Sequence, residues 1–125
     1  MSLNDLTYQI RGAIFTVFKE LGTGLLESVY EAALMYELHK IGHTARSQVG
    51  LPVVYKGIKL ELGYKIDVLV ENHIIVEIKS VEFLHNVHKK QLLSYLKLSN
   101  KKLGLLVNFN VSKLVDNESL VRIIN

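Results

Sequence analysis

Residues 65–79, KIDVLVENHIIVEIK, consist of two largely apolar runs on either side of a polar trio. Apolar runs rich in β-branched residues are typical of strands, and the trio suits a three-residue hairpin loop. In such a hairpin Val70 pairs with Ile74, which places Asp67 directly opposite Glu77. Opposed residues share one face of the sheet, so the sequence predicts two neighbouring carboxylates, which a slip of one residue would separate.

The hairpin is flanked by stretches in which apolar residues recur at helical spacing. Residues 6–21 and 26–41 predict two helices, the first with Asn4 or Asp5 as its N-cap. A third helix is expected over residues 85–98. The apolar positions of the second helix are Val29, Ala32, Ala33, Tyr36 and Leu38.

Alternating and β-branched residues predict the strands. They cover residues 49–55, 58–62, 64–70, 74–78, 102–109 and 120–124. The first four are expected to form a β-meander, whereas the helix between the fourth and fifth makes that pair parallel. The predicted fold class is α/β: two N-terminal helices, a meander, a crossover helix and two C-terminal strands around a mixed sheet flanked by helices.

Composition narrows the class of protein. The chain has 125 residues, 49% hydrophobic and 22% charged, which predicts a single domain over residues 1–125. It has no cysteine, which excludes disulfides, thiolate zinc sites and a cysteine nucleophile. Without a signal peptide or an apolar stretch of bilayer length, a cytoplasmic location and no membrane partner are expected. The net charge of +3 permits a polyanionic partner.

The two carboxylates of the hairpin have the chemistry of a magnesium site. Mg²⁺ takes oxygen ligands and keeps several waters, so Asp67, Glu77 and the carbonyl of Ile78 would suffice. Lys79 is two residues from Glu77 and points to the same face, where its ammonium could offset developing charge on a phosphate. The alternative is that Glu77 and Lys79 form the solvent-facing stripe of an amphipathic strand. Asp67, inside an apolar run, requires a cation, hydrogen bonds or a buried lysine partner.

Further polar residues are candidates for the same cleft. Glu27 and Tyr30 share a face of the second helix, although Glu27 is also a typical first-turn acid. Gln91 and Tyr95 share a face of the third helix, where an ordinary exposed pair is the alternative. Four lysines could contact phosphates or simply be solvated: Lys89, Lys90, Lys101 and Lys102. The pair His85 and His88 lacks a third ligand at metalloprotease spacing and is expected at the surface.

Several segments together carry a resemblance to a known family. The heptad GLLESVY at 24–30 resembles the signature of the GxxExxY protein family, a branch of the PD-(D/E)XK nuclease superfamily. GYKID at 63–67, VEIK at 76–79, QLLSY at 91–95 and LLVNF at 105–109 follow in the order of that family. The resemblance covers essentially the full chain and implies a restriction-endonuclease-like core.

The resemblance also implies roles for residues. Asp67 and Glu77 would be metal ligands, Lys79 the catalytic lysine, and Glu27 a helix-borne acid at the metal site. Gln91 and Tyr95 would form an accessory motif.

The leading hypothesis is a Mg²⁺-dependent nuclease, with Mn²⁺ as a substitute, that hydrolyses phosphodiesters of nucleic acid, expected to be DNA. A non-catalytic module that binds nucleic acid or protein is the alternative, as is a structural domain with a buried ion network. A small nuclease is also expected to need a partner protein or a second copy.

Overall fold

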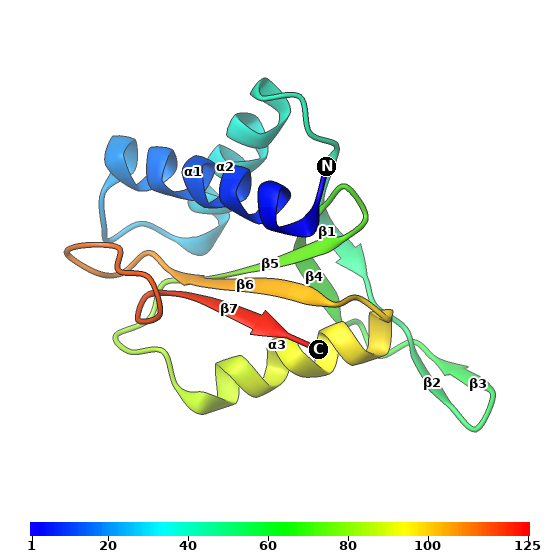
Figure 1. Cartoon of the computed structure of the whole chain (residues 1–125). Coiled ribbons are helices and arrows are strands. Elements are labelled where there is room, and N and C mark those ends of the chain that lie inside the picture. The colour runs from blue at the N-terminus through cyan, green and yellow to red at the C-terminus, as the bar shows by residue number, and fades with distance from the viewer.

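The computed structural model describes residues Met1–Asn125, and its centre is a five-stranded mixed sheet of order β1-β4-β5-β6-β7 (Figure 1). Its strands are β1 (Ala45–Gly50), β4 (Lys65–Val70), β5 (Ile74–Lys79), β6 (Leu103–Asn108) and β7 (Leu120–Ile124). Only β5 and β6 run parallel, as the crossover helix between them requires. The predicted α/β class and mixed sheet are confirmed.

Helices cover both faces of the sheet. Helices α1 (Leu3–Leu21) and α2 (Glu27–Lys40) lie on one face, and α3 (Asn86–Ser99) lies on the other (Figure 1). The larger core forms between the sheet and the first pair, and a smaller core forms beneath α3. None of α1, α2 and α3 combines the length and the hydropathy that spanning a bilayer requires.

The central hairpin has the predicted register. Val70 pairs with Ile74 and Val68 with Val76 across the antiparallel strands β4 and β5. Burial explains why the register is fixed, because four residues of β4 and five of β5 are inaccessible. A slip of one residue would turn every side chain of the strand to the opposite face of the sheet. Apolar side chains would then leave one core, and charged side chains would enter the other.

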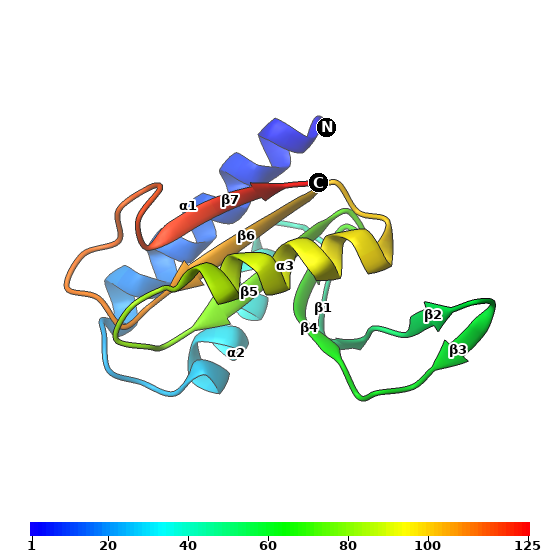
Figure 2. The same cartoon turned by 90° about the horizontal axis from the view of Figure 1, so that it is seen from below.

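The predicted meander is wrong at its start. β1 pairs directly with β4, while β2 (Val53–Tyr55) and β3 (Ile58–Leu60) form a separate two-stranded sheet between them in the chain. This hairpin projects from the body of the molecule (Figure 2). Local alternation predicts a strand but not the strand with which it pairs. The predicted strand over residues 49–55 is divided at Pro52, which has no N–H to donate to a sheet.

Two details of the helices also differ from prediction. Ser2, rather than Asn4 or Asp5, caps α1, accepting a hydrogen bond from the Asp5 N–H. In α2 the buried residues are Tyr30, Leu34 and Leu38, four apart. Val29 and Tyr36 are exposed, because the face of α2 that meets the core is narrower than its apolar composition suggests.

The smaller core sets how closely α3 approaches the sheet. Gly104 in β6 lies directly beneath Leu92 of α3, and a Cβ atom at Gly104 would come within 2.8 Å of a Leu92 methyl group. Since Leu92 is fully buried, it has little room to move aside. The absence of a side chain at position 104 therefore allows this helix–sheet distance.

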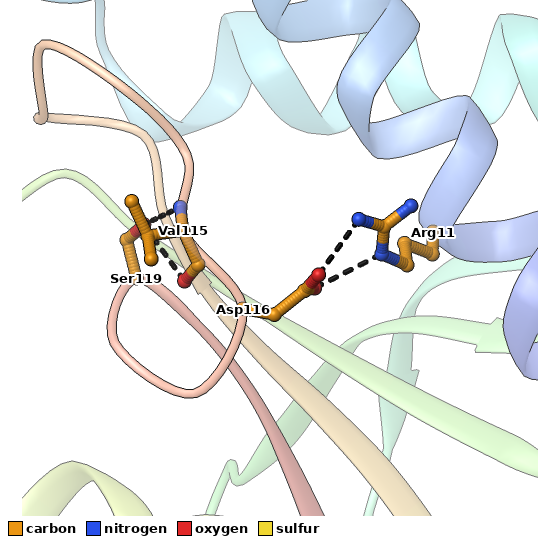
Figure 3. A network of polar contacts seen from close by, with 4 residues as sticks. All are labelled: Arg11, Val115, Asp116 and Ser119. Carbon is orange, nitrogen blue, oxygen red and sulfur yellow. Dashed lines mark hydrogen bonds and ion pairs between the residues drawn. The ribbon is translucent and has the colours of Figure 1, made fainter.

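The segment between β6 and β7 is fastened to α1 and to itself (Figure 3). The guanidinium of Arg11 donates to both carboxylate oxygens of Asp116, at 2.9 and 2.7 Å. The Ser119 hydroxyl accepts a hydrogen bond from the Val115 N–H at 2.8 Å. These contacts hold the segment against the α1 side of the sheet.

Candidate active site

The polar site begins where the ladder between β4 and β5 ends. Regular pairing stops at Val68 and Val76, one position before Asp67 and Glu77. There the side chains replace the backbone partners: Asp67 Oδ2 accepts from the Ile78 N–H at 2.8 Å, and Glu77 Oε1 accepts from the Asp67 N–H at 3.2 Å. The predicted juxtaposition of the two carboxylates is present.

Glu77 and the neighbouring lysine lie on one side of the sheet. Val76 and Ile78 pack into the larger core and Ile75 into the smaller one, so alternation directs Glu77 and Lys79 toward the α3 side. In β4 the alternation is interrupted, since Ile66 and Leu69 both pack into the smaller core. Asp67 lies between them and lines a cavity beside α2, while its side chain accepts from the Ile78 N–H.

Glu77 is buried, with 4% of its surface exposed. The interpretation of Glu77 as part of a solvent-facing stripe is therefore wrong. Burial, followed by the charge of Asp67, raises the pKa of Glu77 from 4.5 to about 9. Asp67 is half-buried. The protein thus holds Glu77 beside Asp67, where desolvation and repulsion both disfavour the ionisation of Glu77.

Lys79 is half-buried and forms no ion pair. The three ion pairs of the chain are Arg11–Asp116, His43–Glu71 and Lys59–Glu61. Its positive charge nevertheless acts on the site, since it opposes the rise in the Glu77 pKa and helps to lower the pKa of His88, whose burial contributes most. The ammonium is close to the acids but not bound to either, so it can interact with another anion.

Helix α2 contributes acids from its first turns. Glu27 Oε2 accepts from the Ser80 N–H at 2.9 Å, and the Ser80 hydroxyl donates to the Leu25 carbonyl at 2.9 Å. These contacts fasten the start of α2 to the end of β5. A cavity of about 190 Å³ lies between them. Its lining residues are Glu27, Ser28, Glu31, Gln48, Asp67 and Ile78.

Glu31 is a cavity residue that the sequence analysis missed. Its carboxylate accepts from the Gln48 amide at 2.7 Å, and burial, despite that bond, raises its pKa, with the charges of Asp67 and Glu27 contributing. A signal was present, because Glu31 is four residues from Glu27 and therefore on the same helix face.

Tyr30 lies in the core rather than at the cavity. It is fully buried and stacks on Phe109 with ring centroids 4.2 Å apart. Its hydroxyl donates to the Gly22 carbonyl at 2.7 Å and accepts from the Leu25 N–H at 3.2 Å. Tyr30 thus secures the loop that leads into α2, and this loop carries the Ser80 contact.

The predicted α3 pair lies beside the acids. Gln91 donates to the Tyr95 hydroxyl at 3.3 Å, and the Tyr95 ring contacts Tyr64 with centroids 6.2 Å apart. Burial, followed by the charges of Glu77 and Asp67, raises the pKa of Tyr95. Gln91 is exposed while Tyr95 is buried, so they do not form an ordinary exposed pair.

The basic residues near the start of α3 differ in their surroundings. Lys89 is half-buried and Lys90 exposed. His85 is exposed, as expected, but His88 is half-buried and its Nδ1 accepts from the His85 N–H at 3.0 Å. The two histidines therefore cap α3 reciprocally and do not form a metal pair.

Asn108 also escaped the sequence analysis. It is 2% exposed at the end of β6 and opposite Lys79 in the parallel register. Its amide donates to the Val81 carbonyl at 2.9 Å, and its Oδ1 accepts from the N–H groups of Val81 and Asn110, each at 3.1 Å. This fixes the backbone immediately after Lys79. A lone amide ending an apolar strand was the available signal.

The donor set fits a small divalent cation. Asp67 and Glu77 each use one oxygen on a backbone N–H, and two such acids in a buried setting favour a cation that would offset their charge. Glu27 shares the cavity with Asp67, yet no three His, Cys, Asp or Glu side chains lie close enough to hold a metal together. The geometry fits a cation held by two carboxylates and completed by water or substrate oxygens.

A sequence model of the PD-(D/E)XK nuclease superfamily matches residues 4–122. The chain belongs to this superfamily. The match covers every residue of the site, and PD-(D/E)XK proteins are usually nucleases that use divalent metals such as Mg²⁺. Comparison with curated proteins and with solved structures finds no match.

Proposed function

We propose that the chain is a Mg²⁺-dependent nuclease whose metal ligands are Asp67, Glu77 and the carbonyl of Ile78. The observation that carries this proposal is the replacement of the strand ladder by two carboxylates that bond each other's backbone. A merely structural hairpin would continue its ladder with apolar residues, because buried acids destabilise a fold. Within the superfamily, the heptad at 24–30 supports membership of the GxxExxY branch.

The residues divide into ligands, an electrostatic group and positioning groups. A divalent cation would supply Lewis-acid stabilisation of the phosphate and make water a better nucleophile. Lys79, without an ion-pair partner, would bind a phosphate oxygen and offset the charge that builds there. Glu27 would act from the cavity side, where it also positions Ser80 just beyond Lys79.

The α3 side would contact the substrate, for which DNA is our first candidate. Gln91 is exposed, and Lys89 is only partly covered, so both can reach a phosphate backbone. Tyr95 supports Gln91 through their hydrogen bond. Tyr30 holds the α2 loop and would influence catalysis only through the position of Glu27.

The test is cleavage of labelled single- and double-stranded DNA and RNA by the purified chain, with Mg²⁺, with Mn²⁺ and with EDTA. Cleavage should require the metal. Asp67→Asn and Lys79→Met should each reduce it at least a hundredfold, since each removes a charge at the reacting phosphate.

Matched controls separate chemistry from folding. Glu118→Gln and Lys97→Met likewise remove one carboxylate and one ammonium charge, at exposed positions away from the site, and should retain full cleavage. Circular dichroism and urea midpoints should show that Asp67→Asn and Lys79→Met remain folded. Equal cleavage by all four variants would reject the proposal.

A non-catalytic binding module predicts a different pattern. Calorimetry would then show no binding of Mn²⁺ to the wild type, and DNA retention would not change in Asp67→Asn. The structural-domain alternative predicts a strong loss of stability in Lys79→Met, which the absence of an ion pair at Lys79 argues against.

A further inference from the structure

The β2–β3 hairpin has the features of an unfinished sheet. It is separate from the main sheet and projects from the body (Figure 2). Val54, Ile58 and Leu62 are 64%, 63% and 58% exposed. An isolated two-stranded hairpin is only marginally stable in water, and exposed strand edges invite a further strand. These features indicate that the hairpin is a site for pairing with a further strand.

Only one of its two edges is open to pairing. Pro52 stands immediately before β2, where its missing N–H and fixed ring obstruct a new strand. No proline lies in or beside β3. Lys56 and Gly57 both have positive φ, 49° and 78°, as in a two-residue type I′ turn. That turn makes Tyr55 and Ile58 a hydrogen-bonded pair, so Lys59 directs its N–H and C=O outward.

The sequence along the open edge is self-complementary. Residues 58–62 read IKLEL, with apolar side chains alternating with Lys59 and Glu61. Lys59 Nζ lies 3.8 Å from Glu61 Oε1, which is consistent with both side chains on one face. An antiparallel partner of the same sequence, centred on Leu60, places Lys59 opposite Glu61 of the second copy. Ile58 then meets Leu62 of that copy.

Other registers are disfavoured. A shift by one residue places Leu60 opposite a charged residue. A shift by two places Lys59 opposite Lys59 of the second copy, or Glu61 opposite its counterpart, and like charges directly opposed destabilise a sheet. The two-fold register also makes Leu60 a non-hydrogen-bonded pair, so the outward backbone groups of Lys59 meet those of Glu61. Neither Glu61 nor Leu62 has a positive φ that would prevent an extended conformation.

We propose that β3 is a dimerisation edge, at which two copies of this chain join antiparallel about Leu60 into a four-stranded sheet. The interface is isologous, as expected for a two-fold dimer. It is independent of the proposed nuclease activity, because none of its residues lies among the acids of the site. Tyr64 and Lys65, which follow in the chain, connect the edge to the Asp67 strand.

The test is sedimentation equilibrium of the full chain in EDTA, without nucleic acid, from micromolar to millimolar concentration. The average mass should rise with concentration from 14.2 kDa toward twice that value. Lys59→Glu alone and Glu61→Lys alone should stay monomeric, because each creates like-charged pairs across the edge.

Recombining these charges gives the decisive result. Mixing the Lys59→Glu and Glu61→Lys proteins should restore a dimer of twice the monomer mass, since every opposed pair is again complementary. The double variant carrying both changes should also dimerise. Lys56→Glu, the same charge change in the turn, should not alter association, and unchanged urea midpoints should show that all variants fold.

Two outcomes would overturn the proposal. One is a wild type that stays monomeric throughout; the other is single charge reversals that associate as well as the wild type. If the wild type is monomeric and Lys59→Glu weakens binding to a labelled DNA duplex, the hairpin is a nucleic-acid contact instead. An inactive nuclease would leave all of these measurements unaffected.

Discussion

The chain contains two hairpins of opposite character. In β4–β5 nine of twelve residues are buried, whereas every residue of β2–β3 is exposed or half-buried. Burial fixes the register of the first, while the turn alone fixes that of the second. Charge follows the same division, because the side chains of Lys59 and Glu61 are 63% and 80% exposed whereas Glu77 is held in the interior. Position, rather than residue type, gives a carboxylate its chemistry.

The largest contrast is expected when a valine is truncated in each hairpin and the losses of unfolding free energy are compared. Val76→Ala in β5 should lower the free energy of unfolding by about 2–4 kcal/mol, because it leaves a cavity in the larger core. Val54→Ala in β2 should change it by less than about 0.5 kcal/mol. Urea unfolding at low protein concentration measures both. Similar losses would mean that the projecting hairpin is packed.

The pH dependence of stability should separate the buried acid from the exposed one. The folded-state pKa of Glu77 lies near 9, above its ordinary 4.5, so its protonated form favours folding at low pH and that advantage is lost as the pH rises. Metal-free wild type should therefore lose stability between about pH 4.5 and 9, by at most about 1.4 kcal/mol per pH unit.

Two variants test the origin of that slope. Glu77→Gln should flatten it and also abolish cleavage, whereas Glu61→Gln should leave it unchanged because its side chain is 80% exposed. Saturating Mn²⁺ should flatten it in the wild type by favouring ionised Glu77. A slope that persists in Glu77→Gln would assign it to other groups.

Removal of a tyrosine hydroxyl should give a smaller contrast in stability between the buried and the projecting regions. Tyr30→Phe removes the bonds to Gly22 and Leu25 and should cost about 1–2 kcal/mol of stability, while the stack on Phe109 remains. Tyr55→Phe on the projecting hairpin should have no measurable effect. Loosening of the α2 loop should also reduce cleavage by Tyr30→Phe, and unchanged thermal unfolding in this variant would contradict the role assigned to its hydroxyl.

The smallest difference in stability is expected between variants that each remove one surface ion pair. Arg11 lowers the pKa of Asp116 through their hydrogen bonds, so the pair stabilises the fold above the ordinary pKa of 3.8 and loses this effect as the pH falls below it. Asp116→Asn should cost at most about 1 kcal/mol, and added salt should reduce the difference. Lys59→Ala, which removes a looser pair, should cost less. Urea titrations of both variants at two salt concentrations measure these losses of stability and their dependence on salt.

The sequence predicted the core of the molecule better than its periphery. The β4–β5 register follows from burial, which leaves a strong local pattern, and the parallel β5–β6 pair follows from the length of the crossover. The pairing of β1 with β4 depends on a contact between distant segments that no local pattern records. Glu31 and Asn108 left local signals, a shared helix face and a lone amide at a strand end, but their roles depend on a cavity and a strand register that only the tertiary structure defines.

The lack of a side chain at Gly104 has an effect beyond its immediate neighbours. Since Gly104 sets the spacing between β6 and Leu92, even a single methyl group there would push α3 outward. Tyr95 and Gln91 belong to that helix and would move with it. The placement of Gln91 and Tyr95 beside the acids is therefore set partly by a residue in the interior of a neighbouring strand. A change at this one buried position would displace residues of the site without replacing any of them.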